Sequence, residues 1–138
     1  MSTVMGMTET TMLLWSVVLG LVQIALAAMA GTNDMGLPYN VGARDEPPAK
    51  PMGKIAGRLT RAASNFRETF GLFAVSVILV VLLHRQSSGS ALGAQLYFWA
   101  RVVYVPVYAL GIAWVRTLVW TVSVIGIVMV LLAAFGMA

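Results

Sequence analysis

The stretch Met12–Ala30, MLLWSVVLGLVQIALAAMA, decides the fold class of this chain, because only Ser16 and Gln23 interrupt its apolar side chains. At ~1.5 Å per residue, a helix over this range is about 28 Å long, close to the ~30 Å hydrocarbon core of a bilayer. The rest of the 138-residue chain has the same character: 59% is hydrophobic, 10% is charged, and the mean hydropathy is +0.86. The sequence therefore predicts an all-α membrane protein.

Further apolar segments follow the first run, separated by polar stretches. The run Phe70–Leu83 is short for a membrane span, so its helix is expected to begin near residue 60 and to carry polar residues with it. Trp114–Thr117 is predicted to form the turn between the last two spans. The chain is expected to fold as one four-helix transmembrane domain, 1–138, with spans at about 10–30, 60–84, 91–113 and 116–136 and a Gly- and Pro-rich loop over 31–59.

A cleaved signal peptide is the competing interpretation of the first run, because Ala28–Met29–Ala30 resembles a cleavage site. No Lys or Arg precedes the run, and the run is long for a signal-peptide core. We therefore favour a retained membrane span.

The charge pattern predicts the orientation of these spans. The net charge is +4, and the 31–59 loop carries Arg44, Lys50, Lys54 and Arg58. The positive-inside rule places this loop in the cytoplasm and both termini outside. The chain has no cysteine and a single histidine, so thiolate chemistry of its own and a metal site are not expected. Nothing in the sequence supports nucleic-acid binding.

Two polar faces stand out at membrane depth, where ionisable groups are costly and usually mark a site. Arg61, Asn65 and Glu68 share one face of the second expected helix by their i, i+4, i+7 spacing. On the third, Tyr97, Arg101, Tyr104 and Tyr108 do the same. Glu68 is the economical ionic partner for Arg101. Such a pair could also serve only to lock helices together, with Arg61 reaching the lipid headgroups.

The two motifs together resemble the MAPEG family, the membrane-associated proteins of eicosanoid and glutathione metabolism. The resemblance lies in Arg61-x-x-x-Asn65-x-x-Glu68 at a helix start, in Ala100-Arg101-Val102-Val103-Tyr104-x-x-x-Tyr108, and in Arg116-Thr117 after a short turn. The segment from Tyr39 to Pro47 is similar to bacterial members. With the length and the number of spans, the resemblance covers nearly the whole chain.

The resemblance implies a homotrimer of four-helix subunits in the lipid bilayer, with glutathione bound between neighbouring subunits and a hydrophobic electrophile arriving from the membrane. By position it assigns glutathione binding to six residues: Arg61, Asn65, Glu68, Arg101, Tyr104 and Tyr108. Catalysis falls to Arg116, Thr117 and Tyr108. The chain departs from the family at Ser64, where some members have a further basic residue. The alignment of Arg116 with the arginine of the family could also be shifted by one position.

Three functions follow as hypotheses. The leading one is a glutathione-dependent transferase or peroxidase of the bacterial inner membrane. The alternative is a non-catalytic lipid-binding or scaffold protein of the same fold. Small four-span drug exporters are similar in size but use an acid inside their first helix, where this chain offers only Gln23. We therefore set the exporter hypothesis aside.

Overall fold

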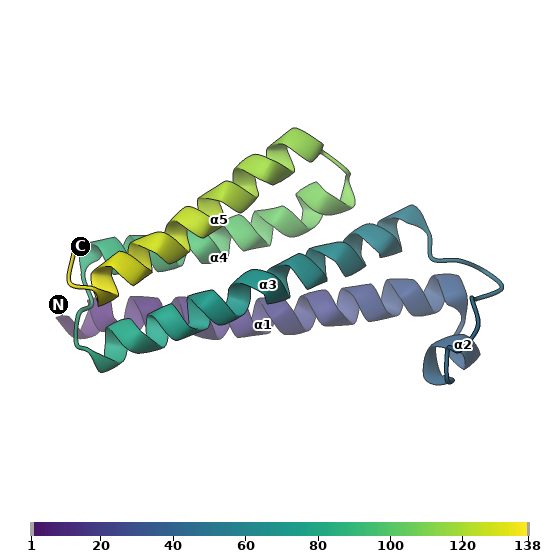
Figure 1. The fold of residues 1–138 in the computed structure, drawn as a ribbon, viewed down its shortest axis with the longest axis horizontal. Coiled ribbons are helices and arrows are strands. Elements are labelled where there is room, and N and C mark those ends of the chain that lie inside the picture. The colour runs from purple at the N-terminus through teal and green to yellow at the C-terminus, as the bar shows by residue number, and fades with distance from the viewer. Residues whose placement is uncertain (1, 138) are drawn as a thin grey trace.

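The computed structural model describes residues 2–137, with side chains from residue 8 onward, and the described part of the chain is helical without a strand. A short α2 lies beside the end of α1, and the four long helices run roughly along one another (Figure 1). The helices are α1 (Ser2–Met35), α2 (Leu37–Val41), α3 (Lys54–Leu82), α4 (Ser88–Ala109) and α5 (Ala113–Ala134).

The distribution of side chains is that of a membrane protein. On α1 the buried side chains are polar, with Glu9, Ser16 and Gln23 seven residues apart on one face, while large residues such as Leu14, Leu21 and Met29 are exposed. Three stretches are long and apolar enough to cross a bilayer, namely Thr8–Met35, Lys54–Leu82 and Ala113–Ala134. The chain is therefore an integral membrane protein. That α4 is a fourth span stays a prediction.

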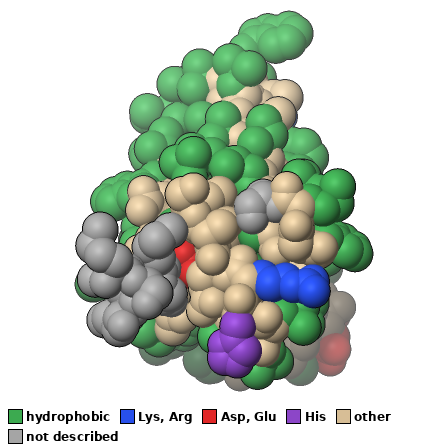
Figure 2. All heavy atoms as spheres, turned by 90° about the vertical axis from the view of Figure 1, so that its left-hand side faces the viewer, with side chains coloured by type: hydrophobic (Ala, Val, Ile, Leu, Met, Phe, Trp, Pro, Cys, Tyr) green, Lys and Arg blue, Asp and Glu red, His purple; other side chains and the backbone are tan. Residues whose placement is uncertain are grey.

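The long helices form two pairs, α1 with α3 and α4 with α5, which lie close at one end and diverge at the other (Figure 1). Both termini lie at the close end, so the chain enters and leaves the bundle on one side. Looking onto this end, Figure 2 shows the single histidine, His84, and few other charged side chains. The expected orientation requires this arrangement, in which the basic 31–59 segment lies at the opposite end.

Small residues bring α4 and α5 together. A Cβ atom placed on Gly126 would lie 2.5 Å from the Gly93 carbonyl oxygen and 2.8 Å from the Tyr97 backbone nitrogen. The two backbones therefore meet at this crossing, as small residues allow in membrane helices. The core beside it is apolar and aromatic, and the rings of Phe73 and Tyr97 stack at 4.0 Å between centroids.

Two arginines, Arg58 in α3 and Arg85 in the turn that follows α3, contact the other pair at both ends of the bundle. At the divergent end, Arg58 Nη1 donates a hydrogen bond of 3.2 Å to the carbonyl oxygen of Ala109, the last residue of α4. At the close end, Arg85 Nη1 donates to the Ala134 carbonyl oxygen at 2.7 Å, at the end of α5. Both cations satisfy free carbonyls and oppose the negative end of a helix dipole. They fix the position of α3 relative to the α4–α5 pair.

Several expected boundaries differ from the structure. The turn predicted at Trp114–Thr117 is wrong, because these residues form the first turn of α5. The chain reverses instead at Leu110–Ile112, where Gly111 has a φ of +74° that only glycine adopts without strain. The expected loop over 31–59 is shortened from both sides, since α1 continues to Met35 and α3 begins at Lys54. Pro51 and Gly53 stand just before this helix start.

Candidate functional site

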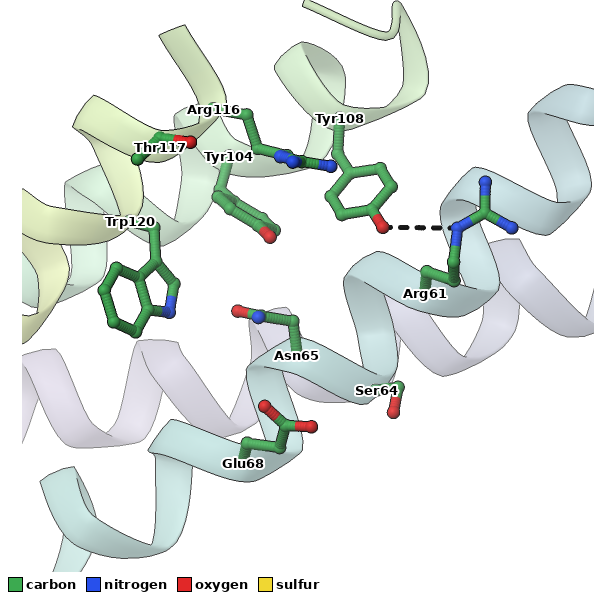
Figure 3. A pocket seen from close by; sticks show the side chains of 9 residues that line it. All are labelled: Arg61, Ser64, Asn65, Glu68, Tyr104, Tyr108, Arg116, Thr117 and Trp120. Carbon is green, nitrogen blue, oxygen red and sulfur yellow. Dashed lines mark hydrogen bonds between the residues drawn. The ribbon is translucent and has the colours of Figure 1, made fainter. Parts of the chain in front are cut away.

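A cavity of about 440 Å³ opens between α3, α4 and α5 in the divergent half of the bundle (Figure 3). Three helices supply its walls, and most of its lining side chains are polar. From α3 come Arg61, Ser64, Asn65 and Glu68, from α4 come Tyr104 and Tyr108, and from α5 come Arg116, Thr117 and Trp120. The structure thus brings together every predicted site residue except Arg101, which lies behind the cavity wall.

Helical spacing explains why the α3 residues point the same way. Arg61, Asn65 and Glu68 are separated by four and three residues, which places their side chains on one face of a helix. Glu68 is exposed, and the Oδ1 atom of Asn65 is buried without a hydrogen-bond partner. An unsatisfied buried oxygen beside a cavity is free to accept a hydrogen bond from a ligand.

Tyr108 stands between two cations at the centre of the cavity. Arg61 Nε donates a hydrogen bond of 3.2 Å to the Tyr108 hydroxyl oxygen, drawn as the dashed line in Figure 3. The Arg116 guanidinium lies 5.0 Å from the centroid of the Tyr108 ring, within the range of a cation–π contact. Because its oxygen accepts from Arg61, the hydroxyl keeps its own proton to donate. This corner of the cavity therefore presents three donors to an anion.

Arg101 is buried, with 1% of its surface exposed, and none of its three guanidinium nitrogens has a hydrogen-bond partner. Its guanidinium lies 4.1 Å from the centroid of the Tyr104 ring and 5.8 Å from that of Phe66. The predicted Arg101–Glu68 ion pair is wrong for the protomer. The guanidinium lies over the Tyr104 ring inside the bundle, whereas the Glu68 side chain is exposed and lines the cavity.

Thr117 lines the cavity, but its hydroxyl faces its own helix. Thr117 Oγ1 donates a hydrogen bond of 3.2 Å to the carbonyl oxygen of Ala113, one turn earlier in α5. This geometry leaves the oxygen as an acceptor for a ligand and commits the proton to the backbone. As a proton donor toward a thiol, Thr117 is therefore less suited than Tyr108.

Sequence reasoning missed two lining residues. Trp120 is not among the predicted site residues, yet it lies one turn after Arg116 on the same face of α5, and this spacing could have placed it in the site. Ser64 departs from the family pattern, and it also lines the cavity.

The charges around the cavity favour an anionic ligand. Arg61 and Arg116 line it, Arg101 lies directly behind Tyr104, and Glu68 is the one carboxylate among the described lining residues. Arginine binds carboxylates bidentately, and a lone carboxylate can receive an ammonium group. The arrangement therefore suits a small zwitterion with an excess of negative charge.

Comparison with known proteins gives a match to a family model. No curated protein matches the chain. The model of the MAPEG family matches residues 12–136, which include every helix that lines the cavity. The chain therefore belongs to the MAPEG family.

Proposed function

We propose that the protein is an integral membrane glutathione transferase or peroxidase, which binds glutathione in the α3–α4–α5 cavity. The observation that carries the proposal is the placement of Tyr108 between Arg61 and Arg116, opposite a single carboxylate, Glu68. Family membership makes glutathione the natural zwitterion for such a site. No metal takes part in the proposed reaction.

The charges of glutathione match those of the cavity. Glutathione carries two carboxylates and one ammonium group at neutral pH. The Arg61 guanidinium receives one carboxylate, and Glu68 receives the ammonium group. Asn65 supplies an unpaired acceptor for a peptide N–H of the ligand, and Tyr104 forms the wall behind it. The Arg101 guanidinium, which lies behind Tyr104, adds positive charge to this side of the site.

The chemistry begins with the glutathione thiol, which loses its proton to water in the open cavity. A cysteine thiol has a pKa near ~8.5, so only a few per cent is thiolate at neutral pH. The Arg116 guanidinium and the Tyr108 hydroxyl stabilise the thiolate as a charge partner and as a donor. The sulfur electron pair then attacks the electrophilic carbon of an apolar substrate, a C–S bond forms, and the leaving group departs with its bonding pair.

We also propose an oligomeric state, a membrane and an orientation for the protein. The protein is a homotrimer of four-span subunits in a bacterial inner membrane, with the 31–59 segment cytoplasmic and both termini outside. The basic residues of this segment and the shared end of the two termini support the orientation. The exposed apolar surface of α1 and α5 supports lipid and subunit contacts.

A non-catalytic lipid-binding or scaffold protein of the same fold is the second candidate. The observation in its favour is that the cavity offers few groups that could activate a thiol. Ser64 replaces a cation of some catalytic relatives, and the Thr117 proton is directed to Ala113. In this case the cavity binds an anionic headgroup and holds it unchanged.

Glutathione is expected to bind the purified, detergent-solubilised protein saturably and to give ultraviolet thiolate absorbance at neutral pH. Calorimetry measures the binding, and S-methylglutathione is the matched control ligand, because it keeps all charges but cannot form a thiolate. Binding of both ligands with a thiolate signal from glutathione alone supports the enzyme. Equal binding without that signal favours the non-catalytic candidate, and no binding at millimolar glutathione contradicts both the site and the activity.

Replacement of Arg101 by Leu is expected to leave the ligand-free protein as stable as the wild type or more so, because a buried guanidinium without a hydrogen-bond partner is costly. Affinity for glutathione is expected to fall about tenfold, which corresponds to ~1.4 kcal/mol. Thermal unfolding with and without glutathione measures both effects. A variant that is destabilised without ligand and binds glutathione normally would show that Arg101 serves only the fold.

A further inference from the structure

A second hollow lies at the end of α1 where the short α2 packs beside it (Figure 1). Its volume is about 270 Å³, and none of the described residues that line it also lines the α3–α4–α5 cavity. We call it the α1–α2 pocket. The lining residues are Ala27, Ala28, Gly31 and Met35 from α1, Asn40 from α2, Thr60 from α3, and Arg44 and Met52 from the segment between α2 and α3.

The α1–α2 pocket lies at the level where hydrocarbon gives way to lipid headgroups. The apolar run of α1 ends at Ala30, and polar residues follow. A hydrocarbon core of ~30 Å corresponds to ~20 helical residues, so a core that begins at Leu82, the end of α3, ends near residue 62. Ala28 therefore lies inside this boundary and Thr60 just outside it. One end of the pocket faces the hydrocarbon and the other faces the headgroups.

The short helix α2 suits this boundary. Leu37 and Val41 lie four residues apart on one face, and both are largely exposed. The Asn40 Nδ2 atom donates a hydrogen bond to the Thr32 hydroxyl oxygen, which ties α2 to α1. Exposed apolar side chains at this depth are covered by lipid. A lipid molecule is therefore expected directly beside the pocket.

Arg44 is the one charged residue among the described residues that line the pocket. Its backbone has a φ of +56°, which residues other than glycine rarely adopt. The Nε atom donates a hydrogen bond of 2.9 Å to the Asn40 carbonyl oxygen, which holds the guanidinium beside the pocket. The two Nη atoms make no hydrogen bond or ion pair with the described part of the chain. They are available to bind two oxygens of one phosphate group.

The other polar groups of the pocket offer acceptors. The Asn40 amide nitrogen already donates to Thr32, and the amide oxygen is left for a ligand. Thr60 Oγ1 donates a hydrogen bond of 2.9 Å to the Ala56 carbonyl oxygen, so its lone pairs remain. An ionised phosphate diester has no proton to give to such acceptors, whereas the hydroxyl groups of a polyol do. The pocket therefore matches a phosphate that carries a hydroxyl-bearing substituent.

The charges near the pocket favour a ligand with a net negative charge. No carboxylate is among its described lining residues. Asp45 and Glu46 follow Arg44 in the chain but do not line the pocket. A zwitterionic headgroup would bring an ammonium group next to the Arg44 guanidinium, and like charges repel. An anionic headgroup has no such cost.

We propose that the α1–α2 pocket binds one anionic phospholipid with a hydroxyl-bearing headgroup, of the phosphatidylglycerol class. Arg44 binds the phosphate, and the side-chain oxygens of Asn40 and Thr60 accept hydrogen bonds from the headgroup hydroxyls. The acyl chains begin against Ala28 and Gly31, where small side chains leave room for them. The pocket is separate from the glutathione cavity, so the inference goes beyond the proposed function and does not depend on it.

Native mass spectrometry of the detergent-solubilised protein, titrated with phosphatidylglycerol, tests the proposal. One lipid per chain is expected to bind, and phosphatidylcholine, which carries an ammonium group, should bind about tenfold more weakly. Arg44→Ala should lower the affinity for phosphatidylglycerol by a similar factor. The matched control, Lys50→Ala, removes a cation from the same segment but outside the pocket and should leave the affinity unchanged.

Three outcomes overturn the proposal. Equal binding of the two lipids would show that the headgroup is not recognised. Equal losses in Arg44→Ala and Lys50→Ala would show a general attraction to positive charge, and no loss in Arg44→Ala would place the lipid elsewhere. Glycerophosphoglycerol, the same headgroup without acyl chains, should not displace the lipid at equal concentration. Full displacement would mean a site for a soluble phosphate ester and not for a lipid.

A second pair of variants tests the apolar end of the pocket without changing any charge. Ala28→Leu fills the space proposed for the acyl chains and should weaken phosphatidylglycerol binding. Ala25→Leu makes the same change at another exposed position of α1, outside the pocket, and should not. Equal effects of the two would contradict the placement of the lipid. Glutathione binding by Arg44→Ala, measured by calorimetry, shows that the variant is folded and tests the proposed function separately.

Discussion

The Arg116→Ala variant is expected to bind glutathione with less than a tenfold loss of affinity but to turn over an activated aryl halide about 100-fold more slowly. The reason is the place of Arg116, whose guanidinium lies 5.0 Å from the Tyr108 ring centroid at the end of the cavity opposite Glu68. In the proposed complex it faces the sulfur and not the carboxylates. Single-turnover kinetics and thiolate absorbance at neutral pH measure the loss, which should shrink at alkaline pH as the thiol ionises unaided.

Two further variants make this result specific. Arg116→Lys keeps the charge without the planar guanidinium and is expected to recover part of the rate. Arg44→Ala removes an arginine that is exposed near α2, outside the cavity, and should change neither binding nor rate. A full loss of rate in Arg44→Ala, or an unchanged thiolate signal in Arg116→Ala, would contradict the role of Arg116.

The polar faces of the site were predictable from the sequence because helical geometry alone determines them. Arg61, Asn65 and Glu68 had to share one face of α3, and Tyr104 and Tyr108 one face of α4, whatever the helices pack against. The apolar runs likewise predicted helices, since a bilayer leaves the backbone few other ways to satisfy its hydrogen bonds.

What the sequence could not predict depends on how the helices are rotated against one another. The pairing of Arg101 with Glu68 followed from charge alone, but α4 turns Arg101 toward Phe66 and Tyr104 inside the bundle, while Glu68 is exposed in the cavity. The turn predicted at Trp114–Thr117 lies too late in the chain, because these residues form the first turn of α5. The feature that decides its position is a single backbone conformation, the positive φ of Gly111.

The same argument applies to the crossing of α4 and α5, because the sequence alone does not show what Gly126 packs against. Gly126→Ala is expected to lower the free energy of unfolding by about 1–3 kcal/mol, despite the better helix propensity of alanine. The added Cβ would lie 2.5 Å from the Gly93 carbonyl oxygen, a backbone atom that cannot move without separating the helices. The helices α4 and α5 also carry three side chains of the proposed glutathione site, Tyr104, Tyr108 and Arg116. The affinity for glutathione should therefore fall together with the stability.

Gly71→Ala is the matched control, since it makes the same chemical change in the middle of α3, where a Cβ atom would meet nothing within 4 Å. Here the helix propensity acts alone, and the variant should be as stable as the wild type or up to ~1 kcal/mol more stable. Detergent titration followed by circular dichroism compares the two. Equal effects at both positions would mean that α4 and α5 do not meet at Gly126. A loss confined to Gly126→Ala identifies this backbone contact as the one that sets the spacing of the cavity walls.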